Sequence, residues 1–200
     1  MKFYLFRHGQ TDWNKERRIQ GHSNIPLNKT GQEQALKLRE ILSHLELDII
    51  YSSDLDRAFE TAVIGIGDTD IKVEKDIRLR EAHFGEAEGM LLGDIVSKFG
   101  EDTWNKFMTL DPDDLEISFP GGESRKSSIV RMRAVIDELR RDNNFERVGI
   151  STHGGVVRNL LASYLIESGK QGKFDIPIPN CVVYELDFST GEAIVSGPIE

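Results

Sequence analysis

The stretch KFYLFRHGQT, residues 2–11, begins as an apolar run and ends in a charge, an imidazole and a glycine. Short apolar and aromatic runs of this kind are typical of buried β-strands. In open α/β sheets, ligands bind at the carboxyl ends of the strands. Gly9 allows a sharp turn or a close approach of the backbone to a ligand. The stretch therefore predicts a strand that presents Arg7 and His8 at a binding edge.

A second stretch with the same layout lies far along the chain. Residues 146–152 read ERVGIST, which is again strand-like, and His153, Gly154 and Gly155 follow before an apolar helical pattern. Two strand-end histidines, each followed by glycine, predict a pair that meets at one edge of a sheet. A strand over 48–51 feeds the polar residues SSDLDRA, which places Arg57 near the same edge.

The rest of the chain alternates strands with helices. Helical spacing of apolar residues predicts helices over 31–44, 123–142 and 155–167. The first of these is expected to start at Thr30, with Glu33 completing a capping box. Further strand-like runs lie at 71–74, 181–188 and 192–196, and a Ser-Thr-Gly turn separates the last two.

This alternation predicts an α/β fold, with a three-layer α/β/α sandwich around a mostly parallel sheet. The final hairpin is expected to add antiparallel strands. Residues 12–29 are polar and irregular, and about 86–121 mix short helical patterns with acidic loops. We expect one domain over 1–200 with a small cap insertion at about 86–121.

Composition narrows the class of protein. The chain has 200 residues and a formal net charge of −9, which argues against a general nucleic-acid or membrane-surface binder. Cys181 is its only cysteine, so an internal disulfide and a cysteine-rich metal site are excluded. Because there is no run of about 20 apolar residues and no leader pattern, we expect a cytoplasmic protein without a membrane partner. Composition leaves the oligomeric state open.

Four separated motifs together resemble those of the histidine phosphatase superfamily, also called the phosphoglycerate mutase-like family. They are RHGQT at 7–11, SSDLDRAFETA at 52–62, LREAHFGEAEG at 79–89 and HGG at 153–155. Length and pattern are most similar to the broad-specificity and α-ribazole phosphatases of that family. The resemblance implies a metal-independent phosphomonoesterase that acts on a small phosphate ester without a cofactor.

The resemblance also implies roles for the strand-end residues. A neutral imidazole can attack phosphorus and form a covalent intermediate, and His8 matches the family's nucleophile. Planar arginines bind phosphate through paired hydrogen bonds, so Arg7 and Arg57, together with His153 if protonated, are expected to hold the phosphoryl group. Glu81 matches the position of the proton donor and base.

Other residues are assigned smaller roles. Asn14 and the backbone amide of Gly154 are expected to donate to the phosphoryl group, while Gln20 and Gly21 are expected to bind substrate at the entrance. His22 adjoins that entrance, and the sequence leaves open whether it contacts the substrate or has a structural role. His83 is interpreted as structural or peripheral and His44 as an exposed surface residue. Competing carboxylates for the acid role are Asp54, Glu86 and Glu88.

The motifs do not separate a phosphatase from a mutase. Residues 86–118 contain only Lys98 and Lys106 as cations among many acids. That segment suits a small, triply charged phosphoglycerate poorly, so we expect a phosphatase for a larger or less charged organic phosphate. The alternatives are a cofactor-dependent phosphoglycerate mutase and a catalytically silent module that binds phosphate esters. A zinc hydrolase is disfavoured because such sites usually need three protein ligands.

Overall fold

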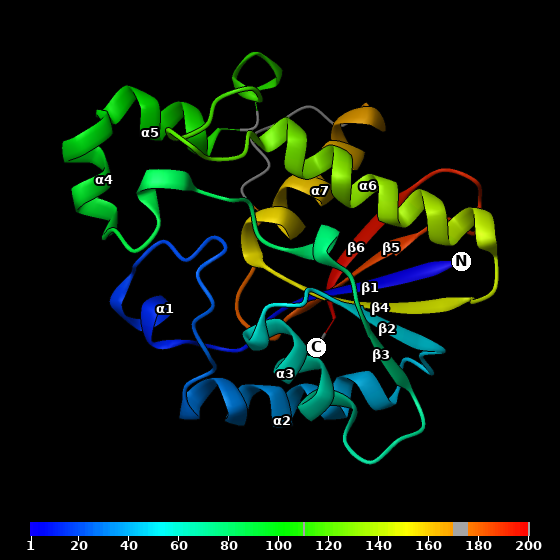
Figure 1. Ribbon diagram of the computed structural model, residues 1–200. Coiled ribbons are helices and arrows are strands. Elements are labelled where there is room, and N and C mark those ends of the chain that lie inside the picture. The colour runs from blue at the N-terminus through cyan, green and yellow to red at the C-terminus, as the bar shows by residue number, and fades with distance from the viewer. Residues whose placement is uncertain (110, 170–175, 200) are drawn as a thin grey trace.

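A computed structural model describes residues 1–109, 111–169 and 176–199, which form one mixed sheet flanked by helices (Figure 1). The strands are β1 (Lys2–Arg7), β2 (Ile49–Ser52), β3 (Lys72–Lys75), β4 (Arg147–Thr152), β5 (Val183–Asp187) and β6 (Ile194–Ile199). Their order is β3-β2-β4-β1-β5-β6. The first four are parallel, and β5 and β6 are antiparallel. The predicted mostly parallel sheet with an antiparallel C-terminal addition is confirmed.

The register of β1 and β4 explains how distant motifs meet. Arg7 at the end of β1 pairs with Thr152 at the end of β4. The His8 amide then donates to the Thr152 carbonyl at 3.0 Å. His8 and His153 therefore leave two neighbouring strands at the same level.

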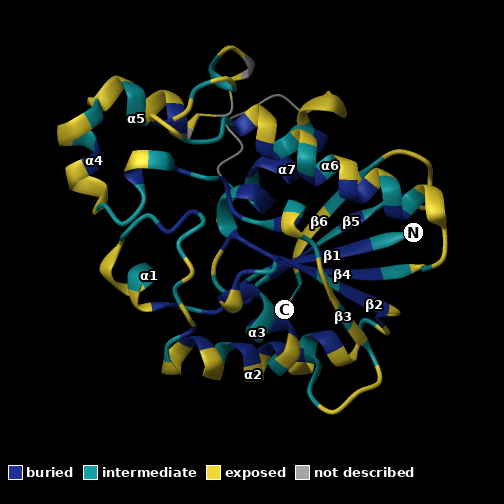
Figure 2. Cartoon of the chain, viewed as in Figure 1, coloured by how far each residue is buried: buried dark blue, intermediate teal, exposed yellow. Residues whose placement is uncertain are grey.

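Helices cover both faces of the sheet. Figure 1 shows α2 (Lys29–Ser43) and α3 (Asp56–Ile66) on one face, and α6 (Arg125–Asp142) and α7 (Gly154–Glu167) on the other. Separate apolar clusters fill the two interfaces. Figure 2 shows the buried strands as the continuous centre of the molecule. Strands that helices cover on both faces are expected to be apolar throughout, and the apolar sequences of the central strands fit this arrangement.

Local capping corrects two of the sequence predictions. Residues 12–16, expected to be irregular, form the short helix α1 (Asp12–Glu16), which a reciprocal Thr11–Asn14 capping box begins. Helix α2 is capped by Asn28 rather than Thr30, because the Asn28 side chain accepts a hydrogen bond from the Gly31 amide at 2.9 Å. Asparagine is at least as good an N-cap as threonine, and it comes first in the chain.

Residues 86–121, which we call the cap segment, lie beyond the carboxyl ends of the parallel strands (Figure 1). They contain α4 (Leu92–Phe99), α5 (Glu101–Met108) and the 3₁₀ turn η3 (Pro112–Asp114). Two more 3₁₀ turns, η1 (Ile77–Leu79) and η2 (Gly85–Ala87), precede α4. Phe84, Ile95, Phe107 and Phe119 form a small apolar cluster of their own. None of the described helices combines the length and apolar character needed to cross a membrane.

Candidate active site

His8 follows β1 directly, and its side chain is almost completely buried. Its Nδ1 lies 2.7 Å from the carbonyl oxygen of Gly9. Since a carbonyl only accepts, Nδ1 carries the proton and Nε2 keeps its lone pair. The Nε–H of Arg57 donates to this Nε2 at 3.3 Å, which fits the same tautomer. The fold therefore presents Nε2 of His8 as an unprotonated nitrogen.

Arg57 lies in the first turn of α3 and is fully buried. Besides the bond to His8, its Nη1 donates to the Ser23 carbonyl at 2.7 Å and its Nη2 to the Gly21 carbonyl at 2.8 Å. Burial lowers the pKa of Arg57 to about 10, and the nearby Glu81 charge opposes that decrease. A guanidinium has five N–H groups, so two remain for a ligand. Arg57 is thus a fixed cation held by neutral carbonyls.

His153 is the N-cap of α7, and its ring centroid lies 5.2 Å from that of His8. Its Nε2 lies 2.9 Å from the Ser53 hydroxyl, whereas its buried Nδ1 has no partner among the described residues. Burial lowers the pKa of both histidines well below the usual value, and the Arg57 charge lowers it further. Both rings are therefore neutral at pH 7 in the free protein. The phosphoryl-binding role that was conditional on a protonated His153 stays a prediction.

Arg7 lies at the end of β1, beside the start of α7. Its Nη1 donates to the Ile178 carbonyl at 2.8 Å, while its buried Nε has no partner among the described residues. A Cβ at Gly154 would lie 3.2 Å from this Nε, so the glycine leaves the guanidinium room against the helix start. Arg7 Nε and His153 Nδ1 are thus two unsatisfied polar atoms close to His8.

Glu81 is brought to the same place by the segment that follows η1. Its carboxylate is buried and accepts from the amides of Gly155 at 3.0 Å and Val156 at 3.1 Å, both in the first turn of α7. A carboxylate is favoured there by the partial positive charge of the helix N-terminus. Burial lowers the pKa of Arg7 and of Arg57, and the Glu81 charge opposes the decrease in both. The five predicted catalytic residues therefore lie together.

The sequence analysis missed Arg131, which holds the Glu81 segment in place. From α6, its Nη1 donates to the carbonyls of Arg78 and Arg80, both at 2.6 Å, and its Nη2 donates to the Glu81 carbonyl at 2.9 Å. Glu123 pairs with its Nε at 2.8 Å and its Nη2 at 2.9 Å. Arg131 stands one turn from buried Val135, and a cation on an apolar helix face was the available signal.

The smaller predicted roles fall on a loop beside His8. Asn14 Oδ1 accepts from the Thr11 amide at 3.2 Å, and Gln20 Oε1 accepts from the Thr11 hydroxyl at 3.0 Å. Gly21 supplies the carbonyl that holds Arg57. His22 Nε2 lies 2.8 Å from the Glu81 carbonyl. These contacts support the site from within the protein, so direct substrate contacts of Asn14, Gln20 and Gly21 stay predictions.

The competing carboxylates are each engaged elsewhere. Asp54 forms a bidentate ion pair with Arg80, and Glu86 forms an ion pair with Lys98 at 2.9 Å. Glu88 accepts from the backbone amides of His22 and Ser23. His83 is half exposed and bonds the Gly121 carbonyl, and His44 is exposed. Glu81 is therefore the carboxylate that the fold brings to the histidine pair.

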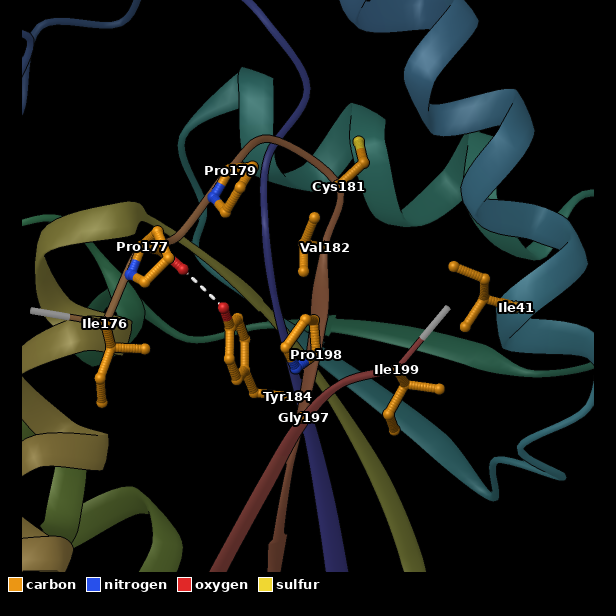
Figure 3. A pocket seen from close by; sticks show the side chains of 10 residues that line it. All are labelled: Ile41, Ile176, Pro177, Pro179, Cys181, Val182, Tyr184, Gly197, Pro198 and Ile199. Atoms are coloured by element: carbon orange, nitrogen blue, oxygen red, sulfur yellow. Dashed lines mark hydrogen bonds between the residues drawn. The ribbon is translucent and has the colours of Figure 1, made fainter.

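An apolar cavity of about 510 Å³ lies at the antiparallel side of the sheet (Figure 3). Its lining is Ile41, Ile176, Pro177, Pro179, Cys181, Val182, Tyr184, Gly197, Pro198 and Ile199. The Tyr184 hydroxyl is directed to the Pro177 carbonyl, at 2.5 Å. None of the predicted site residues lines this cavity. Within the described residues, no three His, Cys, Asp or Glu side chains cluster as a metal site would require.

Known proteins share both the sequence pattern and the fold. A profile described as the Histidine phosphatase superfamily (branch 1) matches residues 3–197. The Phosphoglycerate mutase-like protein 4 of Arabidopsis thaliana is 38% identical over 159 residues, which cover 78% of this chain and 67% of that protein.

Two solved structures have similar folds. Bacillus stearothermophilus YhfR has a TM-score of 0.85 at 30% identity, with 100% of this chain and 98% of that one covered. The mycobacterial glucosyl-3-phosphoglycerate phosphatase in complex with VO3 has a TM-score of 0.83 at 27% identity, with 98% and 96% covered. The match over nearly the whole chain, together with the paired histidines, shows that this protein belongs to the histidine phosphatase superfamily.

Proposed function

We propose that the protein hydrolyses phosphate monoesters through a phosphohistidine formed on His8. The observation that carries this proposal is the unprotonated Nε2 of His8 beside two buried polar atoms without partners, His153 Nδ1 and Arg7 Nε. Buried polar atoms are normally satisfied, and an unsatisfied pair calls for a ligand. A phosphoryl group has the charge and the acceptor oxygens to satisfy both.

Binding would place the phosphoryl oxygens among fixed donors. Arg7 Nε, the free N–H groups of Arg57 and an Nδ1–H of His153 are the donors, with the Gly154 amide as a further predicted one. For the His153 donor, the proton sits on Nδ1 and the Ser53 hydroxyl donates to Nε2. Phosphoryl transfer depends mainly on positioning and charge stabilisation, which prearranged donors supply.

In the first chemical step, the Arg57 Nε–H turns from His8 to a phosphoryl oxygen, and the freed Nε2 lone pair of His8 attacks phosphorus as the bond to the ester oxygen breaks. The Gly9 carbonyl accepts from Nδ1–H and stabilises the positive charge that develops on the ring. Glu81 in its acid form gives its proton to the leaving oxygen. Oε1 already accepts from the amides of Ala82 and Val156, whereas Oε2 accepts only from the Gly155 amide, so Oε2 retains a lone pair for this exchange.

In the second step, Glu81 takes a proton from water as the water oxygen attacks phosphorus. The phosphorus–nitrogen bond breaks, its electron pair returns to Nε2, and inorganic phosphate leaves. A mutase would use a substrate hydroxyl in place of this water. The relatives are named for both reactions, and the acidic cap segment favours hydrolysis over transfer to a small polyanion.

The test is phosphate release from p-nitrophenyl phosphate and a panel of alkyl phosphates by chelator-treated protein. His8→Ala is expected to abolish release, and the matched control His44→Ala, at an exposed position, is expected to retain it. Quenching with alkaline detergent, after mixing with substrate labelled in its phosphoryl group, should trap label on the protein in an acid-labile, alkali-stable form. Full activity of His8→Ala would overturn the proposal. Interconversion of phosphoglycerates without phosphate release would establish the mutase alternative.

A further inference from the structure

Arg125 is a buried cation that the proposed reaction does not use. It is the first residue of α6 and only 1% exposed, yet Nη1 and Nη2 have no hydrogen-bond partner among the described residues. A buried charge without a partner is strongly unfavourable, which is why such groups are normally paired. No hydrogen-bonding group of the described residues compensates this arginine, so its two terminal nitrogens are available to a ligand.

The surroundings of Arg125 destabilise its positive charge further. The partial positive charge at the start of α6 disfavours a cation there. Burial lowers the pKa of Arg125 to about 10, and the positive charge of Arg158 contributes to the decrease. The Phe107 ring, 5.1 Å from the guanidinium carbon, offers a weak cation–π contact. Asp114 opposes the decrease in pKa without a hydrogen bond to Arg125.

Arg158 connects this cation to the phosphoryl site. It lies on α7 one turn after Gly154, the residue against which the Arg7 guanidinium packs. Burial also lowers the pKa of Arg7, and the Arg158 charge lowers it further. Within the described chain, Arg158 forms no hydrogen bond or ion pair through its side chain. Helix α6 packs on α7, and the contact of Arg125 with Phe107 places that arginine against the cap segment.

We propose that Arg125 and Arg158 bind a second oxyanion, a carboxylate or a phosphate, on the alcohol part of the substrate. This inference rests on the proposed phosphatase function and names its substrate class. It also revises the expectation of a less charged substrate, which counted cations only within residues 86–118. Both arginines lie outside that stretch, Arg125 on helix α6 and Arg158 on helix α7.

The test compares ω-carboxyalkyl phosphates of increasing chain length with their methyl esters, which differ only in the remote charge. The measured quantity is the ratio of kcat/KM for acid over ester at each length. A hydrogen bond to a charged group corresponds to roughly a 10- to 100-fold effect, so Arg125→Met should lower the best ratio by about that factor. Lys126→Met removes an exposed charge from the neighbouring residue and should leave the ratio unchanged.

A parallel series of alkane bisphosphates and monophosphates distinguishes a second phosphate from a carboxylate. Calorimetric binding of both series to the His8→Ala protein gives the same ratios without catalysis. If Arg125→Met leaves every acid-to-ester and bisphosphate-to-monophosphate ratio unchanged, the inference is overturned even where phosphate release stands. If no ester is hydrolysed, the proposed function fails, and the binding ratios still decide whether the subsite exists.

Discussion

Arg125 and Arg131 stand six residues apart on the same helix, yet their surroundings differ completely. Arg131 donates to three backbone carbonyls and pairs with Glu123. Arg125 is more deeply buried, and its terminal nitrogens have no hydrogen-bond partner among the described residues. The N–H groups of Arg131 are hydrogen-bonded within the protein, whereas the terminal N–H groups of Arg125 remain available to a ligand.

This difference indicates a structural role for Arg131 and a ligand-binding role for Arg125. Arg131 fixes the backbone that carries Glu81, so its loss should disturb both the fold and the proton transfer. Among the described residues, the terminal nitrogens of Arg125 make no hydrogen bond and its guanidinium makes only the weak cation–π contact with Phe107, so its loss should cost the fold little and change mainly what the protein binds. Hydrogen bonding at buried positions, rather than charge, is what distinguishes the two.

The largest expected effect concerns Glu81, the residue whose backbone Arg131 holds in place. Glu81→Gln removes the proposed proton donor, and general acid catalysis contributes about 10²- to 10⁴-fold to such reactions. We expect a decrease of that order in kcat for alkyl phosphates and a smaller one for p-nitrophenyl phosphate, whose leaving group needs no proton. Steady-state kinetics with both substrate classes measures the split. An equal decrease for both would contradict the acid role.

The next effect compares the two arginines directly. Arg131→Met leaves Glu123 and three carbonyls without their donor, and breaking a buried ion pair costs about 3 to 5 kcal/mol of folding free energy. Arg125→Met removes an unpaired buried charge, so its stability should stay equal or rise. Urea unfolding of both variants, with Lys126→Met as control, measures this. Equal destabilisation by Arg125→Met would mean that the fold depends on Arg125 after all.

The sequence was sufficient to predict that the two histidines meet, because this prediction depends on only a few physical rules. An apolar run predicts a strand, parallel strands end at one edge, and glycines follow both histidines. Adjacent strands β1 and β4 then bring His8 and His153 together. The strand that ends before SSDLDRA predicted the place of Arg57, and resemblance to a short motif pointed to Glu81. In the structure Arg57 bonds His8, and Glu81 bonds the helix start that follows His153.

Roles that depend on tertiary partners were not predictable in the same way. Arg125 and Arg131 each lie four residues before an apolar position of α6, Ile129 and Val135, so their helix face was readable. Their difference was not, because the carbonyls that satisfy Arg131 come from residues some fifty positions away in sequence. The helix α1 was missed since its five residues carry too little apolar periodicity.

A smaller effect concerns the two neutral histidines of the candidate active site, His8 and His153. Their folded-state pKa lies below the unfolded value of about 6.5, so the unfolded chain takes up protons first as the pH falls. Stability is therefore complete above about pH 6.5 and decreases below it, by about 1.4 kcal/mol per pH unit for each histidine. Urea unfolding between about pH 7 and pH 5 measures the slope. Replacing both with glutamine should flatten it, and His44→Gln should not.

The smallest expected effect concerns the close contact between Gly155 and the Glu81 carboxylate. A Cβ at Gly155 would lie 2.7 Å from Glu81 Oε1, so Gly155→Ala must displace the carboxylate by a few tenths of an ångström. Because the carboxylate is the flexible end of its side chain, the free energy of unfolding should change by less than about 1 kcal/mol. Proton transfer is more sensitive to position, so kcat for alkyl phosphates should fall several-fold while that for p-nitrophenyl phosphate changes less. Gly93→Ala, on α4 with open space around it, is the matched control. A loss of stability without the kinetic split would mean that Gly155 serves packing of the helix start and not the placement of Glu81.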